Sequence, residues 1–260
     1  MTRYIYVGTY TQTGSGKPGS PEGIFIFRMD TDAGTLSPVG AVAAHPNPSY
    51  LAIHPNRRFL YAANELGEGE ASALAIDPFS GRLTYLNSQP THGAAPCYVS
   101  HDPQGRWLLA ANYSSGSLTV FPVGEDGRLG PSSDVVQHQG QGPDSQRQEQ
   151  AHAHSILFDP SGRFVLSADL GLDRVLVYRL DDQKGRLIPN DPPGVDLAPG
   201  AGPRHLAFHP NGRFLFVANE LNSTVTALAW DNEKGALQPI QSLSTLPEGW
   251  VGENYVADIH

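Results

Sequence analysis

A dipeptide of Asp or His followed by Pro returns at regular intervals and limits what this chain can fold into. Its four prolines are Pro55, Pro103, Pro160 and Pro210, at intervals of 48, 57 and 50 residues. Each proline is followed four residues later by an aromatic residue and nine residues later by Asn or Asp, with an apolar run between them. A period of about fifty residues predicts an array of similar structural units.

A second marker, Gly-x-Leu, shares this period. It occurs five times, with its glycine at Gly34, Gly81, Gly127, Gly185 and Gly235. The two markers alternate along the chain. Two different signals with one period indicate a true structural repeat.

The unit that begins at Gly202 shows what each repeat contains. Its segments RHLAF, RFLFVAN, TVTALAWD and LQPIQSL have the length of strands, and HPNGR, ELNS and NEKGA between them carry the residues of tight turns. The first two segments are nearly all apolar, which is typical of strands covered on both faces. Four antiparallel strands per unit predict an all-β fold, a β-propeller in which each unit is one blade. The 28 Gly and 22 Pro also favour turns over helices.

Neither end of the chain completes a ring. The chain opens with three strands (RYIYVGTY, GIFIFRM and LSPVGAV), continues with four full blades and stops at NYVADIH, which we expect to be the first strand of another blade. We therefore predict a single β-propeller domain over residues 1–260 with about five blades, lacking the last blades and the closing strand. The chain is a fragment of a longer protein, an open array, or a ring closed through a second chain. The stop within a hairpin favours the fragment.

Charge and composition limit the classes of partner that this chain is expected to bind. The net charge is −9 and Lys and Arg form no cluster, so neither nucleic acid nor an anionic membrane is expected as a partner. No apolar run approaches the roughly 20 residues of a membrane span, and no secretory signal is recognised. Cys97 is the only cysteine, which excludes an intrachain disulfide. We expect a cytoplasmic protein whose partner is a small molecule. An anionic small molecule is compatible with the negative net charge, because a few inward-facing Arg or His side chains can make a local positive pocket.

The long interval between Pro103 and Pro160 has a local cause. A polar, Gln-rich stretch at 137–154 (QHQGQGPDSQRQEQAHAH) adds about ten residues between two blades. Its composition predicts a solvent-exposed loop at one end of the propeller.

Two positions vary while the rest of the repeat is kept. The residue six before each proline is Ser49, Cys97, His154 or Arg204, and the residue after each Asn or Asp is Glu65, Tyr113, Leu170 or Glu220. Residues shared by all blades serve the common fold, whereas a ligand binds in one place and breaks the symmetry. Arg204 and Glu220 lie at equal distances from Gly212, so they are predicted to be cross-strand neighbours at one mouth of the central channel.

These positions supply a candidate catalytic set, His154, Arg204 and Glu220, from two adjacent blades. A neutral His acts as general base toward water, Arg stabilises a carboxylate, a phosphate or a developing oxyanion, and a carboxylate orients either one. The candidate substrate-binding residues are His152, His205 and Glu65.

Structural explanations for the same residues stay open. Arg204 and Glu220 would form a plain cross-strand ion pair, His154 would be a structural or exposed histidine, and Glu65 would only add polarity to the rim. Four other histidines, His45, His54, His101 and His209, are predicted to be turn residues, since three of them lie within or just beside the repeated turns. No metal site is predicted, because the two histidines of HAH lack further ligands at suitable spacing, and no phosphate-loop, dinucleotide or nucleophile-elbow motif points to a cofactor.

Several segments together resemble the lactonase family of seven-bladed propellers, whose bacterial members include cycloisomerase-type 6-phosphogluconolactonases. They are YVGTYT, the blade ends ANE and ANY, AHAHS, GPRHLAFHPNGRFLFVANEL and the terminal ADIH, and they span the whole chain. The resemblance implies about seven blades and an active site made of His154 (or His152), Arg204 of the PRH motif and Glu220 of the NE motif. It also implies a further Arg in a later blade, beyond His260.

The activity implied by this resemblance is hydrolysis of 6-phosphoglucono-1,5-lactone, a small anionic sugar lactone, to 6-phosphogluconate in the pentose phosphate pathway. His154 would activate water, Arg204 would bind the oxyanion or the anionic substrate, and Glu220 would orient one of them. A related fungal branch implies an alternative, a lactone-forming cyclase or isomerase of the carboxymuconate type. A non-enzymatic propeller that binds proteins is a third possibility. It predicts a large exposed apolar or aromatic patch and no convergent polar cluster at the channel mouth.

Overall fold

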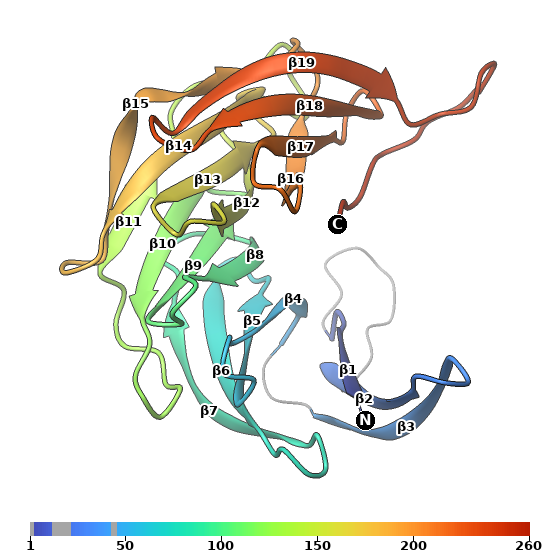
Figure 1. The fold of residues 1–260 in the computed structure, drawn as a ribbon, viewed down its shortest axis with the longest axis vertical. Helices are drawn as coiled ribbons and strands as arrows, with labels where there is room; N and C mark the ends of the chain where they lie inside the picture. The colour runs from blue at the N-terminus through green and yellow to red at the C-terminus, as the bar shows by residue number, and fades with distance from the viewer. Residues whose placement is uncertain (1–2, 12–21, 43–45) are drawn as a thin grey trace.

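The computed structural model describes residues 3–11, 22–42 and 46–260, which form five antiparallel sheets set around a common centre (Figure 1). Blade 1 consists of β1 (Arg3–Gly8), β2 (Ile24–Asp30) and β3 (Thr35–Val42). Blade 2 consists of β4 (Pro48–Ile53), β5 (Phe59–Asn64), β6 (Glu70–Ile76) and β7 (Leu83–Pro90). Blade 3 consists of β8 (Pro96–His101), β9 (Trp107–Asn112), β10 (Ser117–Pro122) and β11 (Asp134–Gln137). Blade 4 consists of β12 (Ala153–Phe158), β13 (Phe164–Asp169), β14 (Arg174–Asp181) and β15 (Arg186–Asp196). Blade 5 consists of β16 (Pro203–Phe208), β17 (Phe214–Asn219), β18 (Thr224–Asp231) and β19 (Ala236–Ser244).

Neighbouring strands in each blade are consecutive in the chain, which confirms the all-β propeller and its count of about five blades. The first strands meet one another near the centre, β1 against β4, β4 against β8, β8 against β12 and β12 against β16 (Figure 1). The prediction that NYVADIH forms a strand is wrong, since residues after β19 form none. A first strand needs the second strand of its hairpin as partner, and the segment instead runs back toward the centre (Figure 1).

The Asp or His before each repeated proline closes the turn between the first two strands of its blade. Asp102 Oδ1 accepts a hydrogen bond from Trp107 N at 2.8 Å, and Asp159 Oδ1 accepts one from Phe164 N at 2.8 Å. His54 and His209 use Nδ1 in the same turn to accept from the backbone N–H two residues later, at 3.1 Å in both cases. These two histidines therefore have a structural position, and His45 lies outside the described residues.

The two repeat markers meet at the joints between blades. A Cβ atom on the glycine of Gly-x-Leu would lie 2.2 Å from the ring of Phe59 at Gly127, and 2.3 Å from the rings of Trp107 at Gly185 and Phe164 at Gly235. Each of these aromatic rings comes from the preceding blade and is the one that follows the repeated proline. The glycines also have positive φ, +81° at Gly127, which side chains disfavour. The two markers share one period because, at each of these three joints, the glycine of one marker contacts the aromatic residue of the other.

The hydrophobic core lies between blades rather than within one. One cluster joins Phe59 and Tyr61 of β5 to Leu108 of β9 and Phe121 of β10, and a second joins Leu109 of β9 to strands of blade 4. Further clusters join blades 1 and 2, and blades 4 and 5. Each blade is therefore stabilised by its neighbours, as in other repeat proteins.

The 137–154 insertion is not simply an exposed loop, which corrects the prediction from its composition. Gln148 is fully buried, and its Nε2 donates to Leu170 O and to Asp173 Oδ1, both at 2.8 Å. His138 is also buried, between Asp169 Oδ2 at 2.6 Å and the Tyr178 hydroxyl at 2.9 Å. Specific hydrogen bonds to blade 4 thus fix a segment whose polarity alone indicated solvent.

Candidate active site

A β-bulge recurs at the same place in the first strand of blades 2 to 5. Strand pairing there skips one residue, between Pro48 and Tyr50, Pro96 and Tyr98, Ala153 and Ser155, and Pro203 and His205. The skipped residues are Ser49, Cys97, His154 and Arg204, the variable set six before each proline. Bulges redirect side chains and are common beside active sites, and all four of these residues line one pocket.

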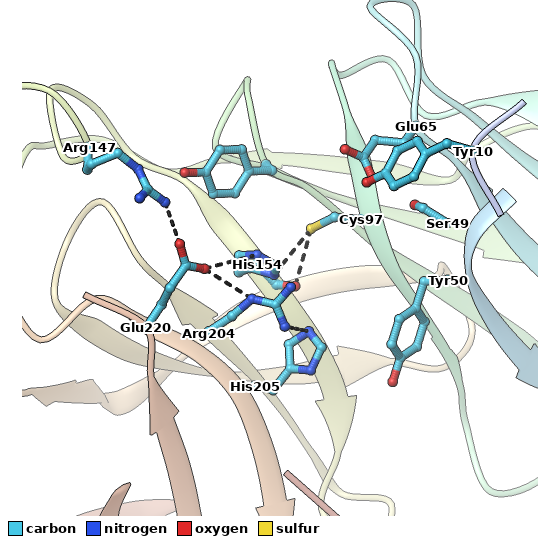
Figure 2. Close-up of a pocket in the computed structure, with 11 residues that line it drawn as sticks. Tyr10, Ser49, Tyr50, Glu65, Cys97, Arg147, His154, Arg204, His205 and Glu220 are labelled. Atoms are coloured by element: carbon cyan, nitrogen blue, oxygen red, sulfur yellow. Dashed lines mark hydrogen bonds and ion pairs between the residues drawn. The ribbon is translucent and has the colours of Figure 1, made fainter. Parts of the chain in front are cut away.

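This pocket has a volume of about 290 Å³. Its wall combines charged and aromatic side chains and includes residues from all five blades and from the insertion (Figure 2). The lining residues are Tyr10, Ser49, Tyr50, Glu65, Cys97, Tyr113, Arg147, His154, Arg204, His205 and Glu220. The polar convergence at the channel mouth differs from what a protein-binding platform predicts.

Glu220 links three cationic or potentially cationic side chains in the pocket. Its Oε2 lies 3.0 Å from Arg204 Nε and 3.8 Å from His154 Nε2, and its Oε1 accepts a hydrogen bond from Arg147 Nη2 (Figure 2). The predicted proximity of Arg204 and Glu220 is therefore present, although the bulge displaces Arg204 from simple cross-strand pairing. The candidate catalytic residues His154, Arg204 and Glu220 lie together.

His154 is neutral near pH 7. Burial of its ring, followed by the positive charge of Arg204 and by His205, holds the pKa of His154 well below the usual 6.5. Its Nδ1 lies 3.5 Å from Cys97 Sγ. Burial likewise raises the pKa of the Cys97 thiol, so this group is protonated and poorly nucleophilic.

His205 lines the pocket beside Arg204 and is held by polar groups on both sides. Its Nδ1 lies 2.5 Å from Asp258 Oδ1, and its Nε2 lies 3.2 Å from Arg204 Nη1. Burial lowers the pKa of His205, against the opposing effect of Asp258. An Nδ1–H that donates to Asp258 leaves Nε2 free to accept from Arg204, so His205 fixes one edge of the guanidinium.

The two other substrate-binding candidates have different positions. Glu65 lines the pocket across from Arg204, and its Oε2 accepts a hydrogen bond from the Tyr10 hydroxyl at 2.7 Å. His152 does not line the pocket. It precedes β12, its backbone N–H donates to Asp169 Oδ1 at 2.7 Å, and its ring stacks on Tyr113 at 4.6 Å, so it supports the wall from behind.

Sequence reasoning missed Arg147, Tyr10 and Tyr50 as pocket residues. Arg147 carried a usable signal, because it is the one Lys or Arg within the 137–154 insertion. Tyr10 and Tyr50 carried none, since the repeat places other aromatic residues in the core. Tyr50 stacks on Tyr98 with ring centroids 4.1 Å apart, and both rings contact His205 edge-on.

Residues 3–11, 22–42 and 46–260 contain neither a metal-binding group nor a membrane-spanning helix. Over those residues, no group of three or more His, Cys, Asp and Glu side chains is placed to hold a metal ion. The same residues include no helix of the length and hydropathy needed to cross a membrane.

Comparison with known proteins connects this pocket to one family. Residues 4–260 match the family described as "Lactonase, 7-bladed beta-propeller". A 6-phosphogluconolactonase of Bacillus subtilis is 40% identical over 262 residues, an alignment that covers 100% of this chain and 72% of the relative.

Solved structures agree. The periplasmic gluconolactonase PpgL of Pseudomonas aeruginosa superposes with a TM-score of 0.90 at 36% identity, over 100% of this chain and 73% of that one. A putative 6-phosphogluconolactonase of Bacteroides fragilis gives 0.86 at 37% identity, over 94% and 68%. The repeated blades and the whole-length match together show that this chain belongs to the lactonase family of seven-bladed β-propellers, with five blades formed by the residues that the structure describes.

Proposed function

We propose that the protein hydrolyses a sugar lactone, 6-phosphoglucono-1,5-lactone, to 6-phosphogluconate. The observation that carries this proposal is the convergence of a buried neutral histidine, an arginine and a glutamate on one open pocket. Family membership and the 40% identity to a 6-phosphogluconolactonase support the same reaction class.

His154 is the proposed general base. Water attacks the lactone carbonyl carbon while the neutral imidazole takes one of its protons, and the carbonyl oxygen becomes an oxyanion. When the tetrahedral intermediate collapses, the bond from that carbon to the ring oxygen breaks, and the imidazolium returns the proton to the departing oxygen. Glu220 Oε2, 3.8 Å from Nε2, stabilises the transient imidazolium.

Arg204 is the proposed oxyanion donor. Glu220 at Nε and His205 at Nη1 hold its guanidinium from two sides, so its orientation is set before substrate arrives. A positioned cation in a partly buried site stabilises developing charge more than water does. Glu65 with Tyr10 faces this group and is proposed to bind sugar hydroxyls.

Single substitutions at the two central residues test these roles. His154→Gln is expected to lower kcat about 10²–10⁴-fold through loss of the base. Arg204→Gln is expected to lower kcat/KM about 10²–10³-fold through loss of the oxyanion donor. A coupled assay of 6-phosphogluconate, corrected for uncatalysed lactone hydrolysis, measures both.

His209→Asn is the control, because His209 is exposed at the far end of the β16–β17 hairpin and Asn keeps a hydrogen-bond acceptor in the turn. Wild-type rates in folded His154→Gln and Arg204→Gln proteins would refute the assigned roles. Formation of a lactone from an unsaturated dicarboxylate, without lactone hydrolysis, would instead establish the cyclase alternative.

A further inference from the structure

Arg147 reaches the pocket from a loop that the other blades lack. The turn that carries it is closed by Asp144, whose Oδ1 accepts from Gln146 N at 2.8 Å and Arg147 N at 3.2 Å. The next residue, Gln148, is fully buried and bonded to blade 4. Arg147 is therefore presented by an ordered loop and not by a free surface segment.

Exposure orders the charged side chains from the mouth of the pocket inward. The exposed fraction of the side chain is 36% for Arg147, 23% for Arg204, 12% for Glu220 and 9% for His154. Arg147 and His154 also contact opposite oxygens of Glu220. A ligand whose reacting carbon lies near His154 therefore presents its far end to Arg147.

The charges near Glu220 do not balance. Arg147 and Arg204 share this one carboxylate, while Glu65 lies across the pocket on the hydroxyl of Tyr10 (Figure 2). Arg204 has a second partner in His205, deep in the pocket. Arg147 has the Tyr113 hydroxyl beside it and the Tyr255 ring face at 5.6 Å, an arrangement that aligns a guanidinium without neutralising it. Two guanidinium groups therefore share one carboxylate, and Arg147 is the more exposed of the two and so the one that an incoming anion reaches first.

We propose that Arg147 binds the phosphate of the substrate and sets the preference of this site for phosphorylated over unphosphorylated sugar lactones. This inference rests on the proposed lactonase function of the same pocket. A phosphate monoester is close to a dianion at pH 7, and a guanidinium fork matches two of its oxygens. In 6-phosphoglucono-1,5-lactone the phosphate hangs from C6, on the far side of the ring oxygen from the carbonyl, so the two groups are several bonds apart. Arg147 and His154, which contact different oxygens of Glu220, are separated in a corresponding way.

The test compares 6-phosphoglucono-1,5-lactone with glucono-1,5-lactone in wild-type and Arg147→Gln proteins. The ratio of kcat/KM for the two substrates is expected to fall at least about tenfold in Arg147→Gln, mainly through a higher KM for the phosphorylated lactone. Arg147→Lys, which keeps the charge but loses the fork, is expected to fall by a smaller factor. Arg82→Gln, on an exposed turn of blade 2, is the control with an unchanged ratio.

An unchanged ratio in folded Arg147→Gln protein would overturn the inference, even if both activities fell, because Arg147 would then act only through Glu220. If Arg147→Gln does not fold, an unchanged ratio in Arg147→Lys overturns it equally. If wild-type protein hydrolyses neither lactone, the proposed function fails by itself. Calorimetric binding of 6-phosphogluconate against gluconate then decides the role of Arg147, with loss of the phosphate preference in the variant as the supporting result and an unchanged preference as the contrary one.

Discussion

At the scale of single residues, the same β-bulge positions a different side chain in each of four blades. The bulge in the first strand of blades 2 to 5 turns Ser49, Cys97, His154 and Arg204 into the same pocket. Burial then sets the protonation state of two of these side chains. It keeps the Cys97 thiol protonated and the His154 imidazole neutral, so the histidine and not the cysteine is suited to accept a proton.

The lowered pKa of His154 predicts a specific loss of stability in acid. Below about pH 6.5 the unfolded chain takes up a proton on this residue that the folded state does not bind, so the free energy of unfolding decreases as pH falls. The contribution reaches at most about 1.4 kcal/mol per pH unit within that window. Urea unfolding at pH 7.5 and pH 5.0 should therefore show a larger loss for wild type than for His154→Gln. Equal losses in the two proteins would contradict a buried neutral His154.

At the scale of strands and turns, the two repeat markers form the contacts that hold neighbouring blades together. Gly127, in blade 3, receives the ring of Phe59 from blade 2, and the same pairing recurs at Gly185 and Gly235. Hydrophobic clusters extend these contacts along the same joints. A change at a marker glycine therefore acts on the interface between blades and not only on its own turn.

Gly127→Ala is expected to destabilise the protein more than Gly34→Ala. Both glycines have positive φ, +81° and +66°, so both substitutions incur about 1–2 kcal/mol of backbone strain. Only at Gly127 does the added Cβ meet a buried ring, 2.2 Å from Phe59, whereas nothing lies within 4 Å of it at Gly34. Overpacking adds about 1–3 kcal/mol. The difference between the two free energies of unfolding, from urea titrations, measures this joint, and no difference would show that the joint yields without cost.

At the scale of the whole molecule, Asp173 connects the segments that deliver the pocket's charged groups. Its Oδ1 accepts from Gln148 Nε2 and from Gly202 N, both at 2.8 Å, and its Oδ2 accepts from Gly200 N at 2.6 Å. One buried carboxylate thus ties the loop of Arg147 to the segment that leads into β16 and Arg204. Two residues 57 positions apart in the sequence are held in one arrangement through it.

Asp173→Asn should weaken both stability and catalysis. Asn tolerates the positive φ of +53° at this position, but it replaces one acceptor oxygen with a donor that faces another N–H group. We expect a loss of about 1–3 kcal/mol in the free energy of unfolding and a lower kcat/KM for the lactone. Asp182→Asn is the control, expected within about 0.5 kcal/mol of wild type, since its side chain is 60% exposed and lies 3.6 Å from Arg106. Wild-type stability and activity in Asp173→Asn would show that the two segments are positioned independently.

Much of the fold could be predicted from the sequence, because the hydrogen-bonded contacts of each hairpin are local in the chain and the blades repeat at one period. Hairpin turns close over a few residues, and each unit packs only on its neighbours, so period, strands, turns and blade count follow from spacing. Comparison of equivalent positions also located His154, Arg204 and Glu220. The terminal NYVADIH has strand-like composition, yet a strand exists only with a hydrogen-bonded partner, which no local pattern specifies.

The pocket itself was decided by tertiary structure. The insertion has no periodicity, and its conformation follows from buried hydrogen bonds to Asp173 and Leu170, which bring Arg147 onto Glu220, 73 positions away. Other features of the pocket likewise depend on packing between blades. These are the bulges that direct the rim side chains, the position of His152 behind the pocket wall and the neutral state of His154. Sequence determined which residues differ between blades. Only folding determined which of them face one another, because burial and hydrogen-bond partners are properties of distant segments in contact.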